Sequence, residues 1–264
     1  MSISSHIRKV ISICCWFLLG AGAVVLMVAA VNARNHRLCE GYKINIKGEN
    51  KGRLFIGRED IIRVLTNNKT ISIKDKSQKS FDLHNIEARL RNEAWIKDAE
   101  LFFDNNGILQ VIITEREPIA RIFTVTGNSY YIDSTGRQLP LSDKISARLP
   151  VFTGFPAEYK KLKKEDKSLI KNIKEVSIYL LKEPFWMAQI AQIDITPKRE
   201  FEMVPTIGNH LIEFGDGTDY EKKFNRLMIF YKQVSARMGM EKYERIKVQY
   251  DQQVIGVKKE QKKI

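Results

Sequence analysis

Apolar and polar residues between positions 43 and 114 alternate with two different periods, and their order predicts a strand-helix-helix-strand-strand unit. Residues 43–48 alternate as a half-buried strand does. Ile61, Ile62 and Leu65 then form a helical stripe behind Glu59 and Asp60, acids that suit the positive end of a helix dipole. The remaining expected elements are a helix over 82–90 and two strands, over 95–103 and 108–114, joined by the turn Asp104-Asn105-Asn106-Gly107.

A second region begins at Pro118, since proline lacks an amide donor and ends or edges a sheet. Its pattern predicts a sheet with packed helices, so the fold class is α+β, and we expect this second sheet to be antiparallel. The expected strands are 119–125, 129–133, 190–196, 201–206, 210–214, 243–250 and 254–257. Apolar stripes at helical spacing predict helices around 169–180 and from Tyr220 to about Arg237.

The N-terminal pattern differs from both, because Val10 to Val31 contains no charged residue over 22 positions. At about 1.5 Å per residue a helix of this length crosses the hydrocarbon layer of a membrane, about 30 Å thick. A cleaved signal peptide is the alternative, since Val31-Asn32-Ala33 offers small residues, but its apolar region is usually shorter. Arg8 and Lys9 precede the span and favour a cytoplasmic N-terminus, although Arg34 and Arg37 follow it.

The chain has 264 residues, of which 44% are hydrophobic and 28% charged. This composition is typical of a chain that can bury a hydrophobic core. The formal charge of +13 permits an anionic partner without identifying one. Lysines crowd the segment 160–174, but acids are interleaved among them and stacking aromatics are not, so we expect a solvated helix face and no nucleic acid. Beyond residue 40 there is no cysteine, which excludes disulfides and thiol chemistry there.

Candidate catalytic chemistry is absent from the sequence pattern. The four histidines are scattered, and no spacing offers a metal three or four ligands. Ser129 and Ser134 lack the glycine-flanked elbow of a hydrolase. Residues 215–219 contain neither the ligands of a calcium loop nor a phosphate-loop lysine. We therefore expect no cofactor, no metal and no enzymatic activity.

Several short motifs follow one another in a specific order and spacing. They are Gly57-Arg58-Glu59-Asp60-Ile61-Ile62, Ala94-Trp95-Ile96, Glu115-Arg116-Glu117-Pro118-Ile119-Ala120, Tyr131-Ile132-Asp133-Ser134-Thr135-Gly136, Leu149-Pro150-Val151-Phe152-Thr153-Gly154 and Tyr243-Glu244-Arg245-Ile246-Lys247-Val248-Gln249-Tyr250. With a short N-terminal tail and one span before them, they cover nearly the whole chain. The sequence resembles the FtsQ/DivIB family of bacterial cell-division proteins.

That resemblance implies a domain organisation. It comprises a cytoplasmic tail (1–9), a transmembrane helix (10–31), a linker (32–41), a POTRA domain (42–117), a C-terminal β domain (118–257) and a basic tail (258–264). The protein would be a single-pass protein of the inner membrane at the division septum, with its domains periplasmic.

The resemblance also implies partners and site residues. Members of the family bind small single-span coiled-coil proteins of the FtsB/FtsL or DivIC type, by adding a partner strand to the edge of the C-terminal sheet. Carried onto this chain, the edge residues are Tyr250, Val254, Ile255, Gly256 and Val257. The first POTRA helix, with Arg58, Glu59 and Ile62, would serve recruitment by other divisome members.

Two other functions stay open from the sequence. A POTRA-containing transport or assembly module would receive unfolded polypeptides, although no more than one such domain is visible here. A membrane-anchored periplasmic enzyme would need a catalytic constellation that the sequence does not display.

Overall fold

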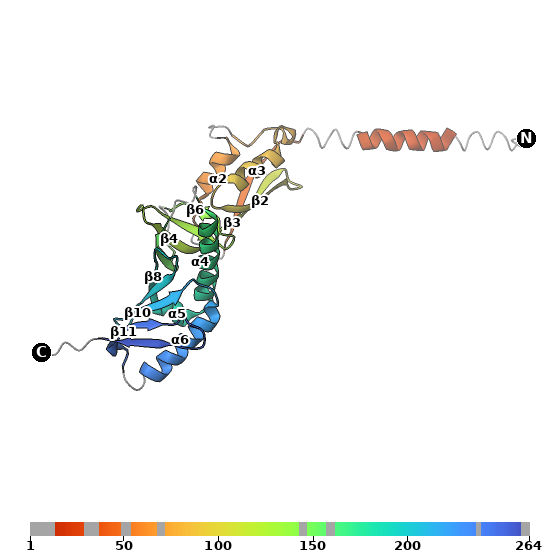
Figure 1. Ribbon diagram of the computed structural model, residues 1–264. Helices are drawn as coiled ribbons and strands as arrows, with labels where there is room; N and C mark the ends of the chain where they lie inside the picture. The colour runs from red at the N-terminus through yellow and green to blue at the C-terminus, as the bar shows by residue number, and fades with distance from the viewer. Residues whose placement is uncertain are drawn as a thin grey trace, which may run out of the picture. The chain divides into compact units, whose positions relative to one another are not determined.

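The computed structural model describes residues 14–28, 37–48, 54–67, 72–142, 147–156, 162–235 and 239–259 (Figure 1). An N-terminal helix covers residues 14–28. Within the described residues no helix is both long enough and apolar enough to cross a membrane. The expected tail over 1–9, the ends of the expected span and the last residues of the basic tail lie outside the described residues. The remaining chain divides into two compact units.

The first unit has the predicted strand-helix-helix-strand-strand order. It contains β1 (Gly41–Lys47), α2 (Arg58–Leu65), a 3₁₀ turn (Gln78–Ser80), α3 (Leu83–Asn92), β2 (Ile96–Phe103) and β3 (Ile108–Glu115). The sheet order is β1-β3-β2, with β1 parallel and β2 antiparallel to the central β3. Asp82 caps α3 by accepting the amide of Asn85 at 3.0 Å. Ile61, Leu90 and Val111 are fully buried, so both helices pack on the sheet through their apolar stripes.

The chain is tied to this unit before β1 begins. Leu38 forms an antiparallel bridge with Ser77, and the Cys39 amide donates to the Lys76 carbonyl at 2.8 Å. The Gln78 amide donates to the Arg37 carbonyl at 3.0 Å. We call residues 37–40 the strap, because these bonds hold it against residues 75–78.

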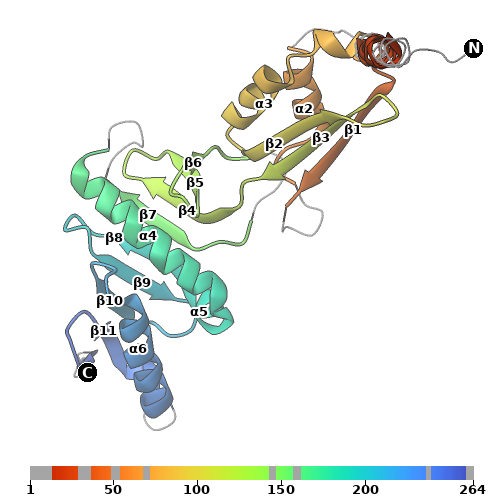
Figure 2. The same cartoon turned by 90° about the vertical axis from the view of Figure 1, so that its right-hand side faces the viewer.

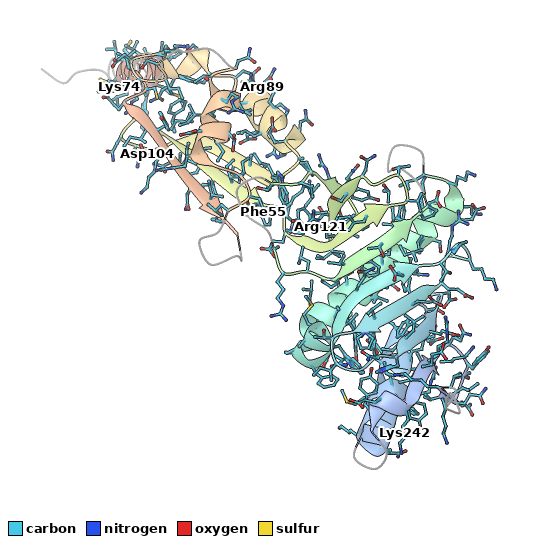
Figure 3. The ribbon with its side chains drawn as sticks, turned by 90° about the vertical axis from the view of Figure 1, so that its left-hand side faces the viewer. Phe55, Lys74, Arg89, Asp104, Arg121 and Lys242 are labelled. Atoms are coloured by element: carbon cyan, nitrogen blue, oxygen red, sulfur yellow. The ribbon has the colours of Figure 1, made fainter. Side chains whose placement is uncertain are left out.

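The second unit is built on a sheet with nine described strands. These are β4 (Pro118–Thr124), β5 (Ser129–Asp133), β6 (Gln138–Leu139), β7 (Val151–Phe155), β8 (Ile190–Ile195), β9 (Phe201–Pro205), β10 (Leu211–Gly215), β11 (Tyr243–Lys247) and β12 (Ile255–Lys258). Their order is β12-β11-β10-β9-β8-β7-β4-β5-β6. Phe55, labelled in Figure 3, also belongs to this unit. Its ring lies edge-on to that of Tyr131.

The expectation of an antiparallel second sheet is wrong. The pairs β4–β7, β7–β8 and β10–β11 are parallel, so the sheet is mixed. Parallel neighbours need long crossovers. The connection from β4 to β7 runs through β5 and β6, and helices provide the other two crossovers. α4 (Lys164–Lys182) leads from β7 to β8 through the short α5 (Pro184–Gln189), and α6 (Tyr220–Ser235) leads from β10 to β11.

Both crossover helices lie on the same face of this sheet, as Figure 2 shows from the helical side and Figure 3 from the other. The core lies between them and the strands. Phe152, Ile193 and Met203 from the sheet meet Ile173 and Phe224 from the helices, all with no exposed surface. In the described part of the chain no helix lies on the opposite face, and strands such as β9 and β10 alternate buried with more exposed side chains, which is the pattern of a sheet covered on one face.

Candidate partner-binding edge

The last described strand, β12, forms one edge of the second sheet. It pairs antiparallel with β11, with Lys247 opposite Ile255, Ile246 opposite Gly256 and Arg245 opposite Val257. On its other side β12 meets no strand in the portion of the chain that the structure describes. An edge of this kind presents main-chain donors and acceptors to an incoming strand.

The backbone alternation tells which groups point outward. The Lys259 amide donates to the Lys242 carbonyl at 2.9 Å, so it points toward β11. Because amide and carbonyl groups alternate in direction along a strand, we expect Val257 and Ile255 to point toward β11 as well. The outward groups are then those of Gly256 and Lys258. Lys258 was predicted as the first residue of the basic tail, and the structure makes it the last residue of β12.

The β12 side chains divide between the two faces of the sheet. Ile255 and Val257 share the helix-free face with Lys247 and Arg245, their partners in register. Ile255 is 38% exposed and Val257 is half-buried. Val254 packs against the core on the way into the strand, and Tyr250, in the β11–β12 connection, is 43% exposed. Ile255 and Val257 therefore place apolar side chains beside the open backbone edge, on the helix-free face.

Gly256 lies on the helix side, where the ring of Tyr243 rests directly on its backbone. A Cβ atom at position 256 would lie 2.5 Å from Cε1 of Tyr243. Tyr243 is itself buried and packs edge-on against Phe230 of α6, with 5.4 Å between ring centroids. The ring reaches Gly256 where the β11–β12 register shifts between Tyr243 and Arg245. Glycine is therefore required by close packing, a common reason for glycine within a strand.

Charged side chains line the helix-free face beside this edge. Arg245 binds Glu213 at 2.9 Å and Glu202 at 3.4 Å, and Lys247 binds Glu213 at 3.1 Å. Burial works to raise the pKa of Glu213, but hydrogen bonds from Arg245 and Lys247 outweigh it and hold that pKa below its usual range. Arg245 therefore bridges two carboxylates that face each other across β9 and β10.

The connection between β11 and β12 is fixed from α6. Arg226 donates to the Val248 carbonyl at 3.1 Å and lies 3.6 Å from the Asp251 carboxylate. Near the other end of β12, the buried His210 shares a hydrogen bond of 2.8 Å with the hydroxyl of Tyr231. Burial, and to a lesser degree the charge of Lys259, lower the pKa of His210. Arg226 thus ties the β11–β12 connection to α6.

The predicted recruitment residues lie at the start of α2 in the first unit. Arg58 is exposed and donates to the Ile44 carbonyl of β1 at 3.3 Å. Glu59 is exposed, and Ile62 is half-buried. Their role stays a prediction. In the described parts of the chain, no group of three or more His, Cys, Asp or Glu side chains is placed to hold a metal ion.

Sequence reasoning missed three contributors to the edge: Lys258, Tyr243 and Arg245. The glycine within a predicted strand was an available signal for close packing, but its partner could not be named. Tyr243 is paired with Lys258, and its ring contacts Gly256 beside a register shift that no local pattern indicates.

Each of the two units matches a known protein family. A family described as FtsQ/DivIB, C-terminal related, matches residues 117–257, and a POTRA-like domain matches residues 37–114. The chain is also similar to the cell division protein FtsQ of Salinibacter ruber, with 28% identity over 176 residues, which cover 64% of this chain and 67% of that protein.

Proposed function

Because this chain belongs to the FtsQ/DivIB family, we propose that it is a membrane-anchored scaffold of the bacterial division machinery that binds partner proteins by strand addition at β12. It would link early and late division proteins at the septum without catalysing a reaction. The proposed partners are small single-span coiled-coil proteins of the FtsB/FtsL or DivIC type.

The observation that carries this proposal is the open edge of β12. Its outward backbone groups belong to Gly256 and Lys258, and Ile255 and Val257 flank them with apolar surface. Main-chain hydrogen bonds would supply affinity, and side chains of the incoming strand beside Ile255 and Val257 would supply specificity.

Membrane anchoring is proposed from the apolar segment 10–31. Its described part is the helix over residues 14–28, whose large apolar side chains are 56–77% exposed. A continuous apolar surface of this kind is unfavourable in water and is covered in lipid. The proposed topology places the N-terminus in the cytoplasm and both folded units in the periplasm.

Recruitment by other division proteins is proposed for the start of α2. Glu59 is the sharpest probe there, since its side chain is exposed, whereas Arg58 also binds the β1 carbonyl of Ile44. Glu59→Lys is expected to reduce septal localisation of a fluorescent fusion while leaving partner capture at β12 intact. Unchanged septal localisation would remove Glu59 from the recruitment surface.

The test of strand addition is partner capture by the tagged full-length protein from crosslinked, detergent-solubilised cells, with co-purifying proteins identified by mass spectrometry. Small single-span division proteins among the main products would support the scaffold. Outer-membrane barrels or a single soluble substrate in their place would favour a transport module or an enzyme and overturn it.

Three edge variants sharpen the test. Lys258→Pro removes an outward amide, Val257→Glu places a charge against the incoming strand, and Ile255→Pro disturbs the pairing with β11 as well. The matched control is Ile207→Glu, since Ile207 is a 73% exposed isoleucine outside β12. Loss of one main-chain hydrogen bond, about 1 kcal/mol, predicts roughly fivefold weaker capture for Lys258→Pro. Full capture by folded Lys258→Pro and Val257→Glu variants would refute strand addition.

A further inference from the structure

The first unit carries exposed cations at the end where β1 begins, next to the strap. They are Arg37 in the strap and Lys74, Lys76 and Lys79 in the loop that it binds. None of the four has an ion pair with any described residue, whereas Arg63 and Arg91 of the same unit do. Figure 3 labels Lys74 at this end of the unit.

The strap fixes this end of the unit to the incoming chain. Besides the bonds already described, the Asp75 amide donates to the Cys39 carbonyl at 2.8 Å, and the Glu40 amide donates to the Gly107 carbonyl at 3.0 Å. The side-chain amide of Gln78 donates to the Leu38 carbonyl at 3.2 Å. Among the described residues after the N-terminal helix, Arg37 is the first with a backbone hydrogen bond to the loop that carries Lys74, Lys76 and Lys79.

The distance from the proposed anchor to the strap is short. Five residues, Asn32 to His36, separate the uncharged segment from Arg37. Even a fully extended chain of this length reaches only about 20 Å. Electrostatic attraction acts over about 10 Å at 0.1 M salt, so a tether of this length lets the loop come within range of the lipid headgroups.

Charge and exposure then favour one orientation of this end. The strap and the loop 74–79 contain two acids, Glu40 and Asp75, beside the four cations, which leaves these two segments with a net charge of +2. Leu38, between them in the strap, is 49% exposed and adds an apolar side chain. Exposed lysines around an apolar residue are the combination that binds an anionic membrane surface.

We propose that the end of the first unit formed by the strap and the loop 74–79 docks on anionic lipid headgroups. This inference rests on the proposed membrane anchor and goes beyond it, since an anchor alone leaves the unit free to turn on its tether. Docking would hold the unit against the membrane in one orientation, with β1 leading away from the bilayer.

The test uses the full-length protein in nanodiscs of phosphatidylcholine, with or without 30% phosphatidylglycerol. Cys14 and Cys15 are changed to alanine, and Ser80→Cys, an exposed position beside the loop, carries a donor fluorophore. Energy transfer to acceptor-labelled headgroups reports how close the loop lies to the lipid. The test variant is Lys74→Ser/Lys76→Ser/Lys79→Ser, and its control is Lys164→Ser/Lys167→Ser/Lys182→Ser, three exposed lysines of α4 removed for the same change in charge.

We expect higher transfer with phosphatidylglycerol than without it, loss of this difference at 1 M NaCl, and a tenfold or larger fall in the docked-to-undocked ratio for the test variant alone. Equal transfer in the two lipid compositions, or an equal fall in the control variant, would overturn the docking proposal. Failure of the protein to co-elute with nanodiscs would instead overturn the anchor and docking together. Partner capture at β12 is measured separately and is untouched by either result.

Discussion

Gly256→Ala is the most direct test of how the edge strand is built. An added Cβ would lie 2.5 Å from Cε1 and 2.7 Å from Cδ1 of Tyr243, and 3.3 Å from Cζ of Phe230. The first two distances are shorter than carbon atoms tolerate, so either the ring or the strand must move. The substitution changes neither charge nor any hydrogen-bonding group, and its effect is therefore steric.

The cost follows from how firmly the Tyr243 ring is held. That ring is 6% exposed and packs edge-on against Phe230, so it has little room to turn away. Forcing an extra carbon into such a site costs about 1–3 kcal/mol. β12 is four residues long and pairs with one described strand, so we expect it to detach before the core rearranges. A cost of that size raises the opening constant of β12 by about 5- to 150-fold.

Amide hydrogen exchange measures this opening residue by residue. In Gly256→Ala the amides of Val257 and Lys259 should exchange faster by that factor, while amides of β8 and β9 keep their protection. Ile255→Ala is the control, since it trims a side chain on the exposed face of the same strand. Tyr243→Leu in the Gly256→Ala background should restore part of the protection. Unchanged exchange in Gly256→Ala, or no recovery in the double variant, would refute the packing argument.

Three further predictions concern stability and charge. Burial works to raise the pKa of Asp133, but hydrogen bonds from Thr135, the Arg137 amide and Arg116 outweigh it and hold that pKa low. Stability measured by urea unfolding should therefore fall as pH drops below about 4, and Asp133→Asn should lose most of this dependence. The lowered pKa of the buried His210 means that the unfolded chain binds its proton more readily. Stability should fall below about pH 6.5, and His210→Gln should flatten that fall in the same assay. Arg245→Met leaves Glu202 and Glu213 facing each other, which should raise the pKa of Glu213 in an NMR titration and cost about 1 kcal/mol or less, because the pair is partly exposed.

Periodicity predicted most elements of both units because their apolar faces are regular. The helix expected around 169–180 is the central part of α4, and the strand expected over 129–133 is β5. The pattern missed the short strands β6 and β7 and the six-residue helix α5 between α4 and β8. It also gave no indication of the parallel pairs, since pairing direction depends on the connections between strands, α4 and α6 among them, rather than on alternation within a strand.

The family resemblance located the candidate edge. Its outward hydrogen-bonding groups and its close packing could be described only from the three-dimensional structure. Which amides point outward depends on the bond from Lys259 to Lys242, and the need for glycine at position 256 depends on Tyr243. The strap could not be predicted from the sequence either. Its partners at 75–78 are nearly forty residues away, and its own residues were expected only as part of the linker 32–41.

The shortness of β12 also bears on self-association. Two copies joined edge to edge through Gly256 and Lys258 would share about four main-chain hydrogen bonds, roughly 4 kcal/mol in total, which corresponds to a dissociation constant near 1 mM before any entropic cost. Pairing would also bring Lys258 of each copy close to the other, and like charges on an edge oppose it. A four-residue edge therefore keeps copies of the chain apart at cellular concentrations. A physiological partner must bring more than a strand, and its selectivity must come from the side chains and flanking segments that it adds.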